Sequence, residues 1–205
     1  MKLVHITTLA TVALAIFVGG YQANSVIAHE GHDAEAIKKA ELKISETLKS
    51  LSPEDQKLVA AQRFCPMMTY SRLGAMGAPI KLTIAGKPVF VCCDSCKEDA
   101  VKGAEATLKT TQKLIECTAV LAKLPMEERI AIESQKYCAV AAGSFLGSMG
   151  APIKLTLDGK PVYLCCNGCT KKAQDNAAAT LAKVDSLKKA GTKDAHGHEH
   201  GDHKK

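Results

Sequence analysis

The sequence predicts an α+β protein built from two small modules in tandem. Its central feature is an internal repeat. Of the 48 residues from 62 to 109, 25 are identical to the residue 73 positions later, and the two copies align without a gap. Repetition at a fixed period indicates two copies of one folding unit. Each copy also joins a short run of alternating apolar residues to segments with helical periodicity, so the unit combines a hairpin with helices.

The 205 residues divide into five segments on this basis. These are a leader over 1–28, a histidine-containing amino-terminal segment with a helix over 29–51, a first module over 52–117, a second module over 118–190 and a histidine-rich tail over 191–205. With four Phe, four Tyr and no Trp in the chain, each module is too poor in aromatic residues to bury a generous core. We therefore expect a cross-link in each module, and cysteine is the obvious candidate.

Helices are expected on both sides of each module. Apolar residues at helical spacing predict a helix within 34–51. The pair Ser52-Pro53 then favours the start of a second helix that leads to Gln62, because serine caps a helix and proline suits its first position. Alanine-rich sequence predicts one further helix over about 95–124 and its equivalent over about 168–189. The tail that follows is expected to be disordered without a ligand.

A β-hairpin is expected in the middle of each module. Apolar and polar side chains alternate from Ile80 onwards, and the apolar run ends at Cys92. In the second copy the turn is Asp158-Gly159, a pair suited to a type I′ turn because both of its residues need positive φ. Ala85-Gly86 fills the same place in the first copy.

The first 28 residues have the parts of a secretory signal. Lys2 precedes an apolar run over 6–18, and Ala28 offers a small residue at the cleavage point. The run is short for a bilayer span of about 20 residues, so export is favoured over membrane anchoring. We expect a periplasmic or other extracytoplasmic protein that has no membrane association after cleavage.

The charge of the chain does not indicate a nucleic-acid partner. The whole chain carries +6, and loss of Lys2 with the leader leaves 26 basic and 21 acidic residues, a net charge of +5. Lysines alternate with acidic residues along the expected helices, and no basic block is interleaved with aromatic residues.

Cysteines carry the strongest functional signal, because eight of the nine lie at repeated positions. The candidate metal ligands are Cys65, Cys92, Cys93 and Cys96 in the first module and Cys138, Cys165, Cys166 and Cys169 in the second. Thiolates at such spacings are typical ligands of Zn²⁺ and also suit Cu⁺. The sequence alone leaves the metal open.

Two arrangements of these thiols are possible. Cys92 and Cys93 point to opposite faces of a strand, so both can bind one ion only if the strand ends between them. Cys93 and Cys96 form a CxxC knuckle, whereas Cys92 and Cys96 are four residues apart and meet if a helix begins at once. In either case Cys65 completes three thiolates, and the remaining cysteine is a fourth ligand or a core residue.

These cysteines and their flanking residues resemble known metal-binding modules. Val89-Phe90-Val91-Cys92, Cys96 and the upstream Cys65-Pro66 are similar to TRASH and YHS-type modules, and the second copy repeats the pattern. The resemblance implies a small treble-clef-like fold in an exported bacterial protein that binds copper, zinc or another heavy metal. Carried over by position, the ligands are Cys65, Cys92 and Cys96, with Cys138, Cys165 and Cys169 in the second copy. The chain departs from the pattern in three ways. The gap from Cys65 to Cys92 is longer than in a TRASH domain, the second cysteine of the upstream knuckle is missing, and Cys93 and Cys166 are additional.

Three other interpretations of the cysteines remain open. Eight cysteines in an exported protein can form four disulfides, two per module, as staples for a weak core. A zinc ion in each module could instead be purely structural, and the protein would then be a zinc-stapled interaction module with no role in metal transport. A thiol oxidoreductase is a third alternative, since CxxC at a helix start lowers a thiol pKa, but the thioredoxin-like βαβ pattern is absent. We expect no catalysis, and we expect the unrepeated Cys117 to be a small buried residue.

Histidines and methionines supply further candidate ligands. All six histidines of the mature chain lie near its ends, and the tail contributes the metal candidates His196, His198, His200 and His203. Closely spaced imidazoles on a flexible segment can bind Zn, Ni or Cu ions. The methionines that could offer thioethers to Cu⁺, or could fill the core, are Met67, Met68, Met76 and Met149.

The sequence therefore predicts an exported protein that binds a heavy metal, Zn²⁺ or Cu⁺ first, and sequesters it or hands it on. Metal ions are the expected ligands. Another metal-handling or efflux protein is the candidate recipient.

We predict that the leader is cut after Ala28, which makes His29 the first residue of the mature protein. The intact mass of protein recovered from the exporting compartment should equal that of residues 29–205. A mass that retains the leader would indicate a membrane-anchored protein instead.

Overall fold

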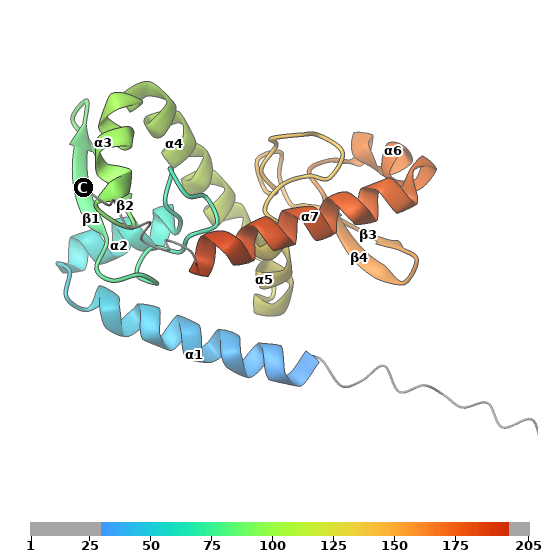
Figure 1. The fold of residues 1–205 in the computed structure, drawn as a ribbon, viewed down its shortest axis with the longest axis horizontal. Helices are drawn as coiled ribbons and strands as arrows, with labels where there is room; N and C mark the ends of the chain where they lie inside the picture. Colours follow the sequence, from blue (N-terminus) through green and yellow to red (C-terminus); the bar gives the residue numbers. More distant parts are fainter. Residues whose placement is uncertain (1–29, 197–205) are drawn as a thin grey trace, which may run out of the picture.

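The computed structural model describes residues 30–196 and shows helices around two small antiparallel sheets (Figure 1). The elements in chain order are α1 (Glu30–Leu48), α2 (Pro53–Gln62), β1 (Ile80–Ile84), β2 (Lys87–Val91), α3 (Ser95–Lys102), α4 (Ala104–Leu121), α5 (Met126–Gln135), β3 (Ile153–Leu157), β4 (Lys160–Leu164), the 3₁₀ turn η1 (Asn167–Cys169), α6 (Thr170–Asp175) and α7 (Ala177–His196). The predicted α+β class is confirmed. No helix within these residues is long and apolar enough to cross a membrane.

Both hairpins form as predicted. Strand β1 pairs with β2 in antiparallel register from Ile80 opposite Val91 to Ile84 opposite Lys87, and β3 pairs with β4 in the same way. The turn residues Ala85 and Asp158 have φ of 47°, and the glycine after each has φ of 75°. Both turn residues therefore have the positive φ that the type I′ prediction requires.

Helix α2 begins as its capping residues predict, whereas the bounds of α1 differ from the expectation. The hydroxyl of Ser52 accepts a hydrogen bond of 3.1 Å from the backbone N–H of Asp55, and Pro53 is the first helical residue. The first helix was expected within 34–51, but α1 ends at Leu48 because residues 49–51 form successive turns that reverse the chain.

The single helix expected after each hairpin is wrong, because the structure has two. Gly103 leaves helical geometry with φ −95° and ψ 38° and divides the segment into α3 and α4, and Asn176 divides α6 from α7 in the same way. Across the first break the hydroxyl of Thr107 donates to the carbonyl of Ala100 at 3.0 Å, and Thr180 repeats this bond to Ala173 at 3.3 Å. These repeated threonines let each short helix stay against its hairpin while the long helix leaves in a new direction.

Helix α4 belongs to both copies, so the predicted boundary between 117 and 118 falls inside one helix. In the first copy Gly74 lies against α1, and a Cβ placed on it would lie 3.1 Å from side-chain atoms of Ile44 and Leu48. In the second copy Gly147 lies against α4, where a Cβ would lie 3.3 Å from Cα and Cβ of Cys117. Cys117 therefore occupies the place of Ile44, and it is buried as expected. Each module rests on the helix that precedes it.

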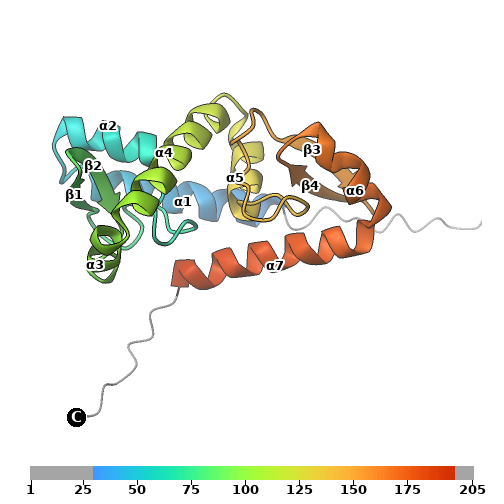
Figure 2. The same ribbon diagram turned by 90° about the horizontal axis from the view of Figure 1, so that it is seen from above.

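Helix α7 returns from the second module toward the first (Figure 2). A Cβ placed on Gly191 would lie 2.7 Å from the ring of Tyr70, so α7 touches the first module closely. The helix continues to His196, so the first six residues of the tail expected to be disordered, 191–196, belong to α7. The leader and the tail candidates His198, His200 and His203 lie outside the described residues.

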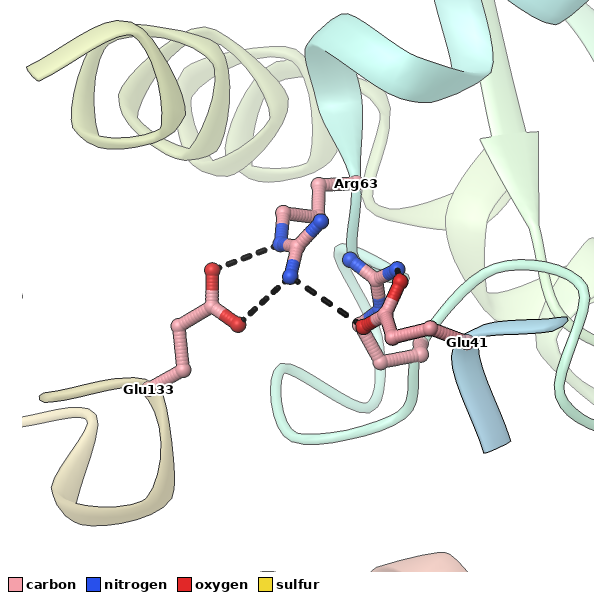
Figure 3. Close-up of polar contacts among 4 residues, drawn as sticks. Glu41, Arg63 and Glu133 are labelled. Atoms are coloured by element: carbon pink, nitrogen blue, oxygen red, sulfur yellow. Dashed lines mark hydrogen bonds and ion pairs between the residues drawn. The ribbon is translucent and has the colours of Figure 1, made fainter. Parts of the chain in front are cut away.

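The two modules also meet through a partly buried ion pair and an aromatic cluster. Arg63 of the first module donates to both carboxylate oxygens of Glu133, at 2.6 and 2.8 Å, and reaches Glu41 of α1 at 3.4 Å (Figure 3). The ring of Tyr70 in the first module meets that of Tyr137 in the second edge to face, with centroids 5.9 Å apart, and Tyr137 in turn stacks on Phe145 of its own module at 4.7 Å. The side chains of Arg63 and Glu133 are only 12% and 10% exposed, so this bidentate pair helps to hold the modules in one arrangement.

Candidate metal centre

The first cysteine of each module is carried by a tight loop that follows a helix end. We call residues 63–73 the Cys65 loop. Arg63 ends α2 with a positive φ of 64°, which turns the chain out of the helix. The N–H of Cys65 donates to the carbonyl of Ser71 at 3.0 Å, and that of Leu73 donates to Arg63 at 3.1 Å. The loop thereby closes on itself and presents Cys65 to the interior, where it is fully buried.

A buried glutamine ties this loop to the hairpin. The amide nitrogen of Gln62 donates to the carbonyls of Phe64, at 2.9 Å, and Phe90, at 2.7 Å. Its oxygen accepts from the N–H of Phe90 at 2.9 Å. Cys65 follows Phe64 and Cys92 lies two residues after Phe90, so the carboxamide holds the two cysteine-bearing segments side by side. Its side chain can make these three bonds because an amide both donates and accepts.

The second module repeats the same clamp. The amide nitrogen of Gln135 donates to the carbonyls of Tyr137, at 3.0 Å, and Tyr163, at 2.6 Å. Its oxygen accepts from the N–H of Tyr163 at 3.0 Å. The function of these glutamines was not predicted from the sequence. Their identity in the two copies, three residues before the first cysteine, is the signal that could have identified them.

The other two buried thiols come from the junction between strand and helix. Strand β2 ends at Val91 and α3 begins at Ser95, so Cys92 leaves the strand while Cys96 lies in the first turn of the helix. Their sulfur atoms are 3.7 Å apart, and those of Cys165 and Cys169 are 3.8 Å apart. Of the two arrangements left open by the sequence, the structure therefore joins Cys92, rather than Cys93, to the buried set.

Each module thus contains three buried thiols that converge on one point. The sulfur atoms of Cys65, Cys92 and Cys96 all lie within 4.8 Å of one another, and so do those of Cys138, Cys165 and Cys169. Sulfur atoms bound to one ion at about 2.3 Å lie about 3.8 Å apart in a tetrahedral site and about 4.0 Å apart in a trigonal one. The spacing in both sets is close to these values, so each set could hold a metal ion. Within residues 30–196 these two sets are the groups of potential metal ligands that converge in this way, and all six of their members are cysteines.

Cys93 and Cys166 lie at the edge of these sets. The sulfur of Cys93 is 3.7 Å from that of Cys92 and 3.6 Å from that of Cys96, so it lies beside two of the buried sulfurs. Cys166 is 4.0 and 3.9 Å from its two neighbours. Both side chains are only partly buried. They place one accessible thiol beside two buried ones in each module.

Hydrogen bonds prepare Cys65 to be a thiolate. Its pKa is lowered from 9.0 to about 6, first because the Cys92 thiol donates a hydrogen bond to it. The backbone N–H groups of Cys92, Met68 and Met67 act in the same direction, while burial opposes them. Burial and the charge of Cys65 raise the pKa of Cys96 to about 12. Of the three buried thiols, Cys65 is therefore the one that ionises most readily.

The second module has the same electrostatic pattern. Burial opposes ionisation of Cys138, but backbone N–H groups of Ala141, Cys165 and Val140 lower its pKa below the ordinary value. The N–H of Ala141 lies 3.4 Å from the Cys138 sulfur. Burial is the largest cause that raises the pKa of Cys169, to about 11. Backbone donors around the first cysteine are thus a property of the repeated loop.

The accessible thiols are also shifted toward the thiolate form. Burial raises the pKa of Cys93, but hydrogen bonds with the Ser95 hydroxyl and with Cys96 outweigh it, and the pKa lies below its ordinary value. The Cys93 sulfur is 3.1 Å from the Ser95 oxygen. Gly168 stands at the position of Ser95 in the second module, so Cys166 has no such hydroxyl beside it.

The methionines are placed differently from one another. The sulfur of Met68 lies 3.9 Å from that of Cys92, whereas the sulfur of Met67 lies 3.6 Å from the hydroxyl of Thr107. Met76 and Met149 are exposed. His196 ends α7, and the site candidates that follow it lie outside the described residues.

The fold and site define a cysteine-rich α+β protein with two tandem three-thiol clusters. No family model, no curated protein and no solved structure matches the chain. The resemblance to TRASH and YHS-type modules therefore depends on the repeated cysteines and the residues that flank them.

We predict that Gln62→Leu disrupts the first cluster selectively. The leucine keeps the volume but leaves three buried backbone groups of Phe64 and Phe90 without a partner, which should cost at least about 2 kcal/mol of unfolding free energy. Tight metal binding should fall in the first module and persist in the second. Denaturant unfolding and metal content of the purified full chain measure both effects.

Gln112→Leu is the matched control, because Gln112 is exposed and bonds only to Glu116, four residues along the same helix. It should change neither quantity. Equal loss of metal from both modules, or none, would contradict a local clamp.

Proposed function

We propose that this protein is an exported metal-binding protein that holds one heavy-metal ion, copper or zinc, in each of two treble-clef-like modules. In this proposal it sequesters the ion or hands it on to another metal-handling or efflux protein, and it catalyses no reaction. The observation that carries the proposal is the pair of buried three-thiol sets with sulfur spacings suited to one ion.

The surroundings of the first cysteine support a metal over a packing role. A buried cysteine that only fills space needs no hydrogen-bond donors around its sulfur. Cys65 instead receives backbone N–H groups that lower its pKa, and Cys138 repeats this arrangement. Because metals bind thiolates, an entering ion needs to displace fewer protons when one sulfur is already ionised.

The partly exposed thiols support transfer of the ion. Cys93 touches two of the buried sulfurs from the outer side of the set. A fourth thiolate there would complete a tetrahedral zinc site, and it would also be the first ligand that a recipient protein could replace. Cys166 would be the equivalent fourth, replaceable ligand in the second module.

A disulfide-stapled interaction module is the second candidate. It is favoured by the short separations within each set, such as the 3.6 Å between the sulfurs of Cys93 and Cys96. All nine cysteines are free thiols in the structure. Thiol counting before and after metal removal separates the candidates, because chelation should release thiols from a metal site and none from a staple. A reversible pair that exchanges with a redox partner would indicate a thiol oxidoreductase.

We predict that replacing Cys65, Cys92, Cys93 and Cys96 with serine halves the tightly bound metal. The second module should keep its ion because its own cluster is separate and lies against α4 and α7. Elemental analysis of the anaerobically purified full chain measures the stoichiometry, and circular dichroism reports folding.

Cys117→Ser is the control, because Cys117 is buried beside Gly147 and is in neither cluster. It should leave the metal content unchanged. Loss of all metal from the quadruple variant would mean one shared site, and no loss would remove the metal proposal.

We predict that deletion of residues 197–205 slows metal loading without reducing final occupancy. The deleted segment carries His198, His200 and His203, whose imidazoles would collect ions loosely before the thiolates bind them more firmly. The deletion begins after His196 so that the contact of α7 with Tyr70 is kept. Stopped-flow loading at limiting metal tests it, with all three histidines replaced by asparagine as a length-matched control. An unchanged rate in both variants would exclude a role for the tail.

A further inference from the structure

The two clusters differ in one sulfur atom. The second and third residues after the first cysteine are Met67 and Met68 in the first module, but Val140 and Ala141 in the second. The thioether sulfur of Met68 lies 3.9 Å from the thiol sulfur of Cys92. That separation equals the spacing expected between two sulfur ligands of one ion, about 3.8 to 4.0 Å. The first module therefore places a thioether sulfur beside one of its three buried thiols.

Met68 is held in this position by packing. Its half-buried side chain packs against the core of the first module, which includes Val59 and Phe90. Its backbone is held as well, because its carbonyl accepts a hydrogen bond of 2.8 Å from the N–H of Ser71 in the closing turn of the Cys65 loop. The sulfur thus belongs to the same closed loop that presents Cys65.

A thioether discriminates between metals. It is a soft, neutral ligand that suits Cu⁺, whereas Zn²⁺ in proteins is bound by thiolate, imidazole and carboxylate. It adds no negative charge to a site that already has several thiolates. This favours an ion of low charge such as Cu⁺ over a divalent ion.

We infer that the first module is a site for a soft monovalent ion, Cu⁺ or its analogue Ag⁺, with Met68 as a ligand, and that the second module lacks this preference. The inference rests on the proposed function, since it assigns different ions to the two proposed sites. The protein would then bind two kinds of ion with one fold.

Met67 is the internal comparison. Its sulfur lies 3.6 Å from the hydroxyl oxygen of Thr107, and the residue is 38% exposed. It is the neighbour of Met68 in the same loop and has the same chemistry, but its sulfur lies against Thr107. Removal of its sulfur should not alter metal preference.

The test measures each site in the full chain, with the four cysteines of the other module replaced by serine. Cu⁺ affinity is measured anaerobically by competition with a chromophoric Cu⁺ chelator, and Zn²⁺ affinity with a zinc indicator. Met68→Leu removes the sulfur and nearly conserves volume, so the fold should persist. We expect Cu⁺ affinity of the first module to fall about tenfold or more, within the range typical for loss of a supporting group, with Zn²⁺ affinity unchanged. Met67→Leu should change neither.

The reciprocal variant keeps the inference testable if Met68→Leu destabilises the module. Ala141→Met places the thioether at the equivalent position of the second module, where it should raise Cu⁺ affinity relative to Zn²⁺. Before any substitution, the first module should already show a higher Cu⁺ to Zn²⁺ preference than the second.

Three results would overturn the inference while leaving the proposed function intact. They are equal metal preferences in the two unsubstituted modules, a parallel loss of Cu⁺ and Zn²⁺ in Met68→Leu, and equal effects of the Met67 and Met68 substitutions. If the unsubstituted chain binds neither Cu⁺, Ag⁺ nor Zn²⁺, the proposed function itself fails.

Discussion

The buried carboxamide of Gln62, repeated as Gln135, is the interaction on which each module depends. The two segments that carry the cysteines are 27 residues apart in sequence, at Cys65 and Cys92, and neither forms a sheet with the other. One side chain satisfies three backbone groups and so joins them. A buried polar group with every bond made restricts geometry more than apolar packing does, because its partners must lie at fixed distances and angles. The small core of Val59, Val89 and Phe90 then needs only to exclude water.

The tandem arrangement supplies the stability that a single module lacks. Each unit buries little apolar surface by itself. Each is also covered by a helix that belongs to its neighbour or to the preceding segment. Helix α4 closes the first copy and supports the second, and α7 returns to touch Tyr70 of the first. The repeat is not perfectly symmetric where the modules meet. Arg63 pairs with Glu133, whereas its equivalent Lys136 is buried and its pKa is lowered by that burial, so the interface is specific for this order of modules.

The chemistry of the clusters follows from the same loops. Backbone N–H groups surround Cys65 and Cys138 and lower the pKa of both thiols below the ordinary value, against the effect of burial. Met68 and its equivalent Ala141 differ, whereas the glutamine hydrogen bonds are the same in both copies. Residues inside the loop can therefore vary without loss of the bonds that hold the cysteine-bearing segments together.

Local periodicity, turn chemistry and residue spacing are enough to predict the fold class, the repeat, the hairpins with their turns and the cap at Ser52. The sequence does not reveal which cysteines meet, that Gln62 joins their segments, that Gly103 divides a predicted helix or that α4 serves both modules. Each of these depends on contacts between residues far apart in sequence, or on a local break stabilised by packing, and the helical propensity of alanine-rich sequence does not reveal such a break. The spacing allows either Cys92 or Cys93 to meet Cys96, and the end of β2 at Val91 is what separates the buried thiol of Cys92 from the accessible thiol of Cys93.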